Sequence, residues 1–265
     1  MRKTITDDEL TGKVRQMKYM TTDPAGARYD YEISHYNAQG TLLKWEKYSE
    51  TNALVKHLLY AYNDHGVLQE ETLQESDGRI VYTNSYYPDG NYRETIQYYG
   101  EDTYKTCYDE AGNVTAQFEN DQPTDIETDP YNEQWNTQSI TDTDGHPAEL
   151  IHYYAYGTLH DITKRKYNAQ RQLIYEATYA SEAALAADKP GSVKTNSYNQ
   201  QHHLTTYTHD RIDEQGDTRR TTFRYHYQYD EHQNWIEKTE TMNNKITGFQ
   251  DKVQFIRKRE ITYHP

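Results

Sequence analysis

Histidine and carboxylate side chains are the residues of this sequence whose types suit metal binding or acid–base chemistry. The chain has 12 His and 42 Asp and Glu residues. The closest groupings of histidine are His202 and His203 with His209, and His226 with His232. Neither grouping belongs to an HExxH motif, and neither has a cysteine pair or a carboxylate at ligand spacing beside it. We therefore expect no metal site and no cofactor.

Asp142, Asp144 and Gly145 form a short acidic motif that is superficially similar to a calcium-binding loop. A calcium loop also needs further Asn or Asp ligands and a closing Glu, which are absent at the required spacing. We interpret the motif as a hairpin turn, because Asp and Gly favour turns. The sequence contains no phosphate-binding glycine loop and no serine nucleophile elbow. No catalytic residue is predicted, and the protein is not expected to be an enzyme.

The chain is organised around tyrosines that end strands. Phe223, Tyr225, Tyr227 and Tyr229 occur at every second position, which places them on one face of an extended strand. The polar stretch 230–234 that follows is typical of a turn. The same arrangement, a tyrosine followed by Asn or Asp and often by Gly three residues later, recurs along the chain. Alternating stripes of this kind predict short antiparallel strands joined by hairpin turns.

Six tyrosine-led turns can be aligned, and the step from Tyr36 to Tyr62 is 26 residues, or two strands and two turns. Glycine occupies the fourth position after the tyrosine in the first three turns, where left-handed backbone is needed. Arg171, His202 and Gln233 stand there in the last three, so we expect those turns to be of another type or longer. The six turns are at residues 36–40, 62–66, 108–112, 167–171, 198–202 and 229–233.

These units resemble the YD-repeat (Rhs-type) family, whose consensus is a Tyr-Asp-x-x-Gly-Asn turn between strands. The best match is Tyr108-Asp109-Glu110-Ala111-Gly112-Asn113, and the likeness covers most of residues 10–263, as for a small bacterial member. The expected fold is all-β: an elongated, curved antiparallel sheet of tandem β-hairpin repeats, with one or two short helices. One helix is predicted in residues 181–191, where Ser181 can cap the start and Pro190-Gly191 ends it. A capping box at residues 6–9 could start the second.

The composition fits a thin, tyrosine-covered sheet rather than a thick aliphatic core. Leu, Ile, Val and Phe make up 38 of 265 residues, about 14 %, which is below the roughly 20 % typical of folded chains. The 28 tyrosines compensate, because each ring buries apolar area while its hydroxyl stays in water. No linker-like stretch divides the repeats, so a single domain spanning residues 1–265 is expected. Cys107 stands alone and is expected to be a buried strand residue.

Negative charge is concentrated in residues 101–150, which hold thirteen acids and one base, Lys105. This segment supplies −12 of the net charge of −14. Blocks of like charge often serve as interaction surfaces, although a solvated loop is the alternative. We expect the stretch 119–144 to bind a basic partner, through the residues Glu119, Asp121, Asp125, Glu127, Asp129, Glu133, Asp142 and Asp144.

Two function classes remain after catalysis is set aside. The first is a non-catalytic protein-binding protein, most concretely an immunity or neutralising protein for a basic bacterial toxin. The alternative is a cell-surface or periplasmic module that binds glycan through exposed tyrosines. Nucleic acid is not expected as a partner, because an acidic surface repels phosphates. No membrane span is predicted. The expected location is cytoplasmic if Met1 is native, and otherwise periplasmic or that of a surface lipoprotein.

The tyrosine stripe generates a test by substitution. Replacing Tyr227 with Ala removes a ring expected to pack against aromatic side chains of neighbouring strands. Cross-strand aromatic pairs contribute roughly 0.2–1 kcal/mol each, so Tyr227→Ala should lower stability by more than a surface change does. Thermal melting measures this, with His226→Ala, on the other face, as the control. Equal melting of Tyr227→Ala and wild type would mean that the stripe has no structural role.

Overall fold

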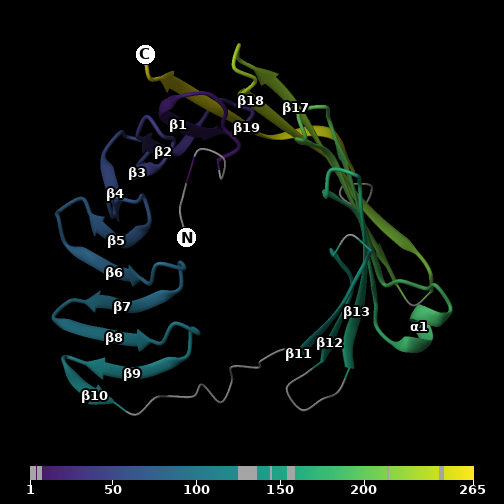
Figure 1. Ribbon diagram of the computed structural model, residues 1–265. Helices are drawn as coiled ribbons and strands as arrows, with labels where there is room; N and C mark the ends of the chain where they lie inside the picture. The colour runs from purple at the N-terminus through teal and green to yellow at the C-terminus, as the bar shows by residue number, and fades with distance from the viewer. Residues whose placement is uncertain are drawn as a thin grey trace. The chain divides into compact units, whose positions relative to one another are not determined.

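The protein is all-β, as the sequence predicts, with 19 antiparallel strands and one short helix in the described residues (Figure 1). The computed structural model describes residue 4 and residues 8–124, 136–143, 145–153, 159–213, 215–244 and 248–265. The chain divides into two compact units. The first comprises Met1–Glu127, Tyr227–Lys238 and Ile256–Pro265, and the second comprises Thr128–His226 and Thr239–Phe255.

Ten strands lie wholly in the first unit. They are β1 (Val14–Thr22), β2 (Arg28–Tyr36), β3 (Leu42–Tyr48), β4 (Leu54–Tyr62), β5 (Leu68–Glu75), β6 (Ile80–Tyr86), β7 (Tyr92–Tyr99), β8 (Asp102–Tyr108), β9 (Val114–Glu119) and β10 (Gln122–Thr124). From β1 to β10 each strand pairs antiparallel with the next.

The second unit contains six whole strands and the helix. They are β11 (Asn136–Thr141), β12 (Pro147–Tyr153), β13 (Leu159–Tyr167), β14 (Leu173–Tyr179), α1 (Glu182–Ala186), β15 (Ser192–Tyr198) and β16 (Leu204–Ile212). Three long strands contribute residues to both units, namely β17 (Thr218–Tyr229), β18 (Trp235–Asn244) and β19 (Phe249–Tyr263).

The two ends of the chain meet in the first unit, where β1 pairs with both β2 and β19. The register with β19 runs from Val14 opposite Tyr263 to Thr22 opposite Ile256. A register shift between Val14 and Gln16 marks a β-bulge. A bulge adds one residue to a strand and so reverses its alternation. For this reason Val14 and Met17, which differ in parity, both enter the core.

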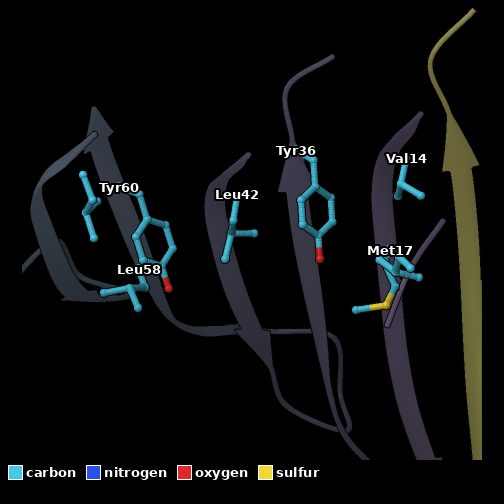
Figure 2. Packing of buried hydrophobic residues seen from close by; sticks show 8 residues of the cluster. Val14, Met17, Tyr36, Leu42, Leu58 and Tyr60 are labelled. Atoms are coloured by element: carbon cyan, nitrogen blue, oxygen red, sulfur yellow. The ribbon is translucent and has the colours of Figure 1, made fainter. Parts of the chain in front are cut away.

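That core lies on one face of neighbouring strands (Figure 2). Val14 and Met17 come from β1, and Tyr36 comes from β2. The other buried members of the cluster are Leu10, Leu42, Leu58, Tyr60 and Leu68. A separate cluster in the second unit consists of Ile162, Ala177 and Tyr179. Tyrosine thus takes core positions beside a few aliphatic residues, as the composition indicates.

All six tyrosine-led turns have the same backbone hydrogen bonds. At Asn37, the residue after Tyr36, the N–H donates to the Thr41 carbonyl (3.0 Å), and the Gly40 N–H donates to the Asn37 carbonyl (2.9 Å). Gly40 has φ +74°, in the left-handed region. The strand before each of the six turns ends at its tyrosine.

The expectation of a different turn at Arg171, His202 and Gln233 is wrong. Their φ angles are +65°, +65° and +64°, and their turns repeat the hydrogen bonds of the glycine turns. These side chains therefore occupy left-handed backbone that costs an L-residue roughly 1–2 kcal/mol. The rest of the turn imposes that conformation on them.

Two further expectations are confirmed. Phe223, Tyr225, Tyr227 and Tyr229 are half-buried along β17, while the residues between them are exposed. The Phe223 ring stacks on Tyr207 in the second unit, and the Tyr227 ring meets Trp235 edge-on in the first. Helix α1 begins after Ser181, whose hydroxyl accepts the Ala184 N–H (3.1 Å).

Of the capping box at residues 6–9, residues 6 and 7 lie outside the described residues, and residues 8 and 9 form a turn.

The three non-glycine turns generate a stability prediction. Arg171→Gly and His202→Gly should each raise the free energy of unfolding by about 0.5–1 kcal/mol. The strain energy that glycine removes from the left-handed backbone exceeds the entropic cost that glycine adds by making the unfolded chain more flexible. Gly216→Ala is the matched reverse change. Gly216 has φ +85°, and a Cβ there would meet no atom within 4 Å. Chemical denaturation should show it to be destabilising. A loss of stability in both glycine variants would contradict this account.

Candidate functional site

Three of the eight predicted partner-binding residues lie in described parts of the chain. Glu119 ends β9, Asp121 lies in the turn that follows, and Asp142 lies in the turn between β11 and β12. The first two belong to the first unit and Asp142 to the second. The others, Asp125, Glu127, Asp129, Glu133 and Asp144, lie outside the described residues. For them the predicted role stays a prediction.

Asp142 forms the turn that the sequence predicts at this motif. Its N–H donates to the His146 carbonyl (2.8 Å), and its carboxylate accepts the His146 N–H (2.9 Å). The His146 ring also lies 3.4 Å from the carboxylate, measured from Nδ1 to Oδ1. Gly145 has φ +81°, as in the tyrosine-led turns. The Asp142 side chain therefore has a structural role in its hairpin.

Glu119 and Asp121 are positioned by the tight hairpin between β9 and β10. Asn120 and Asp121 have φ +50° and +60°, which is the backbone of a two-residue hairpin turn. The Asn120 side chain accepts the Thr103 N–H (2.8 Å) and donates to the Asp102 carboxylate (2.9 Å). These bonds hold the turn against the start of β8. They bring the carboxylates of Glu119 and Asp121 into one region with Asp102.

Two exposed tyrosines lie in the same region. The Tyr99 side chain is 62 % exposed and that of Tyr104 is 42 % exposed. Their rings meet edge to face, with centroids 5.7 Å apart and planes at 75°. The Tyr104 hydroxyl donates to Glu119 Oε1 (3.0 Å). We call the set Tyr99, Glu101, Asp102, Tyr104, Glu119 and Asp121 the acidic corner; all six residues are exposed.

Lys105, the one base of the acidic stretch, is engaged outside the acidic corner. Its ammonium lies 4.8 Å from the centroid of the Phe118 ring and 3.9 Å from Glu94 Oε2. Side chains alternate across a strand, so Lys105 and Tyr104 point to opposite faces. The acidic corner thus presents four carboxylates beside two exposed rings. The acidic stretch indicated part of this site, whereas alternation along β7 and β8 is the signal that would have added Tyr99 and Tyr104.

The chemistry of the acidic corner is that of cation binding. Exposed carboxylates attract Lys and Arg, and an exposed ring face adds a cation–π contact. The histidines named above have other surroundings. His209 Nε2 lies 2.9 Å from Ser192 Oγ, and burial lowers the pKa of His209. Across the described ranges, no group of three or more His, Cys, Asp or Glu side chains is placed to hold a metal ion.

Within the parts of the chain that the structure describes, no helix is both long and apolar enough to cross a bilayer.

Comparisons with known proteins give likeness in structure alone. No protein-family model matches the chain, and no curated protein matches it. A porin-like protein from Bacteroides uniformis aligns with a TM-score of 0.42 at 11 % identity, covering 94 % of this chain and 98 % of that one.

The crystal structure of TcdB2-TccC3-TEV aligns with a TM-score of 0.32 at 10 % identity over 89 % of this chain. That of TcdB2-TccC3-Cdc42 aligns with a TM-score of 0.28 at 13 % identity over 93 % of this chain. This chain spans only 16 % and 15 % of the lengths of those two chains. Scores this low carry no argument about function.

The contact between Tyr104 and Glu119 generates a titration prediction. The hydrogen bond to the Glu119 carboxylate, together with its negative charge, raises the pKa of Tyr104 above the usual value. Glu119→Gln removes the charge that opposes tyrosinate, so the pKa of Tyr104 should fall toward that of an unperturbed tyrosine. NMR titration of the labelled tyrosine ring measures the change. Glu94→Gln is the control, because Glu94 lies beside Lys105. An unchanged Tyr104 pKa in Glu119→Gln would show that the contact is absent in solution.

Proposed function

We propose that this protein is a non-catalytic binding protein for a basic protein partner and that the acidic corner is a contact surface. The observation that carries the proposal is the joint exposure of Tyr99 and Tyr104 among four carboxylates. Negative charge of this density speeds the approach of a positively charged partner. Exposed tyrosine is also enriched among the residues that contribute most to protein interfaces.

Contacts elsewhere in the chain support this chemistry. Tyrosine already binds lysine within the first unit, where the Lys18 ammonium lies 4.8 Å from the centroid of the Tyr31 ring. The Lys238 ammonium likewise lies 5.4 Å from the centroid of the Tyr227 ring. A basic side chain of a partner would find the same ring type at Tyr99 and Tyr104, with carboxylates added. The predicted residues Glu119 and Asp121 belong to this surface.

The most concrete form of the proposal is an immunity or neutralising protein for a basic bacterial toxin. It comes from the resemblance to the YD-repeat (Rhs-type) family, in which we place the chain as a proposal. The six tyrosine-led turns with common backbone hydrogen bonds support that placement. In this form the protein acts by covering the toxin surface, and its charge serves recognition.

Glycan binding through exposed tyrosines is the weaker alternative. Sugar rings stack on flat aromatic faces, and two coplanar rings would form a platform for them. The planes of Tyr99 and Tyr104 instead meet at 75°. This arrangement suits insertion of a single side chain better than stacking of a sugar chain.

The proposal predicts which changes slow association. Glu101→Gln together with Glu119→Gln removes two charges of the acidic corner while keeping side-chain size. The association rate with the basic partner, purified by affinity capture from the source cell, should fall about tenfold at low salt, and the deficit should shrink as salt screens the charges. Stopped-flow fluorescence at two salt concentrations measures both effects.

Two comparisons make this test specific. Glu50→Gln with Glu231→Gln removes the same charge from exposed positions of the first unit outside the acidic corner, and association should be nearly unchanged. Asp125→Asn, Glu127→Gln and Asp129→Asn together test the predicted residues outside the described ranges. Equal association rates for wild type and the Glu101/Glu119 variant at low salt would overturn the proposed surface.

A further inference from the structure

The first unit contains a cavity of about 660 Å³ on the face that carries its core. This volume is within the range of small-ligand sites, roughly 300–1,000 Å³. Met17, Leu42 and Leu58 supply apolar side chains to its lining; Figure 2 shows them on β1, β3 and β4, with Tyr36 of β2 between Met17 and Leu42. An apolar lining alone would suit many ligands. The polar and aromatic groups around it narrow the choice.

Aromatic rings and carboxylates form the walls of this cavity. Tyr19, Trp45 and Tyr60 line it, together with Asp8 and Glu32. The Trp45 indole N–H donates to Glu32 Oε2 (3.0 Å), which holds one carboxylate beside an aromatic face. Asp8 is held by the Tyr36 hydroxyl, which donates to its carboxylate. Both carboxylates are half-buried, so they lose part of their hydration while remaining accessible.

Arg259 also lines the cavity, but its guanidinium is buried. The residue is only 9 % exposed, and its guanidinium carbon lies 3.6 Å from the centroid of the Trp235 ring. Its Nη2 donates to the Asp8 carbonyl (2.9 Å). Nε and Nη1 are buried without a hydrogen-bond partner among the described residues, and desolvation lowers the pKa of Arg259. Its positive charge offsets part of the negative charge of the cavity, and the carboxylates of Asp8 and Glu32 are the charged groups that a ligand can contact.

These surroundings discriminate between classes of ligand. An anion would be repelled by Asp8 and Glu32 and could not reach the buried nitrogens of Arg259. A wholly apolar ligand would desolvate both carboxylates without a compensating partner, which is costly. An organic cation satisfies the carboxylates, lies against the rings and places its aliphatic stem against the apolar side chains.

We propose that this cavity binds an alkylammonium or guanidinium group on an aliphatic stem. The inference rests on the proposed function in so far as the cation is a Lys or Arg side chain of the basic partner. A free small amine has the same chemistry and is the other source. The cavity and the acidic corner share no residue, so each can be disabled separately.

Calorimetric titration of the whole chain with blocked amino acids tests the chemistry. N-acetyl-lysinamide and N-acetyl-argininamide should bind at least about tenfold more tightly than N-acetyl-norleucinamide, which has a similar stem and no charge. N-acetyl-glutamic acid amide should not bind. Equal binding of the norleucine compound, preference for the glutamic acid compound, or no binding by either cation would overturn the proposal.

Substitutions place the binding within the cavity. Glu32→Gln keeps a hydrogen-bond acceptor for the Trp45 indole N–H. It should weaken the binding of N-acetyl-lysinamide about fivefold, and Asp8→Asn should do the same. Glu50→Gln, an exposed change in the same unit, should leave binding unchanged. Trp45→Phe is the second test if either carboxylate variant is unstable. It should reduce the ligand-induced change in tryptophan fluorescence, because Trp45 lines the cavity. Unchanged binding and fluorescence response in these variants would overturn the site.

The same variants distinguish a side chain of the partner from a free amine as the source of the cation. They also test the cavity independently of the acidic corner. If the cation is a side chain of the partner, Glu32→Gln raises the dissociation constant of the partner; if it is a free amine, only the small-molecule titration changes. The Glu101/Glu119 variant should bind N-acetyl-lysinamide like wild type. Slower partner association of that variant at low salt, with intact lysinamide binding, supports both proposals. Failure of lysinamide to bind wild type overturns only the proposed cavity site.

Discussion

The repeated hairpins depend on one hydrogen bond within each turn. The side-chain oxygen of the Asn or Asp that follows the tyrosine accepts the backbone N–H four residues later. All six tyrosine-led turns have this bond, at 2.8–2.9 Å. Asn and Asp are short enough to reach their own backbone in this way. Because the bond fixes the turn, it fixes the register of the hairpin, and a slip by one residue would send every side chain to the other face.

A fixed register allows carboxylates to be buried between strands without losing their partners. The Glu176 carboxylate on β14 accepts a hydrogen bond from Lys194 Nζ of β15 (2.6 Å) and another from Arg165 Nε of β13 (2.8 Å). Burial by itself raises the pKa of Glu176, but the two cations outweigh it and hold the pKa below its usual value. Glu46 on β3 is paired with Lys44 on the same strand and with His35 on β2, and its pKa is also lowered, because these contacts outweigh burial. Such pairs occupy positions that aliphatic residues fill in a protein with a thicker core. They therefore suit this chain, which has few aliphatic residues.

The sequence was sufficient for the local structure, because strand alternation and turn chemistry act over a few residues. The tyrosine stripe at 223–229, the strand ends and the Ser181-capped helix all follow from such patterns. It was insufficient at Arg171, His202 and Gln233, where the hydrogen bonds of the turn override the preference of the residue. The pairing of β1 with β19 joins residues about 240 apart and leaves no local signal. The cavity was missed for the same reason, since Asp8 and Arg259 meet only through that pairing.

The last tyrosine-led turn, at residues 229–233, connects local turn structure with the long-range contacts that form the cavity. Asn234, the residue directly after it, is fully buried, and its side chain accepts the Thr11 N–H (2.6 Å) and donates to the Thr11 carbonyl (2.9 Å). The turn therefore holds the N-terminal segment, and this segment carries Asp8 to Tyr36 and to the cavity. Arg259 from β19 donates a hydrogen bond to the Asp8 carbonyl and lines the same cavity. A cavity built from both ends of the chain exists only while those ends are docked. Any ligand that it binds must then stabilise the docked ends over the separated ones, by an amount that grows with the ratio of the ligand concentration to its dissociation constant.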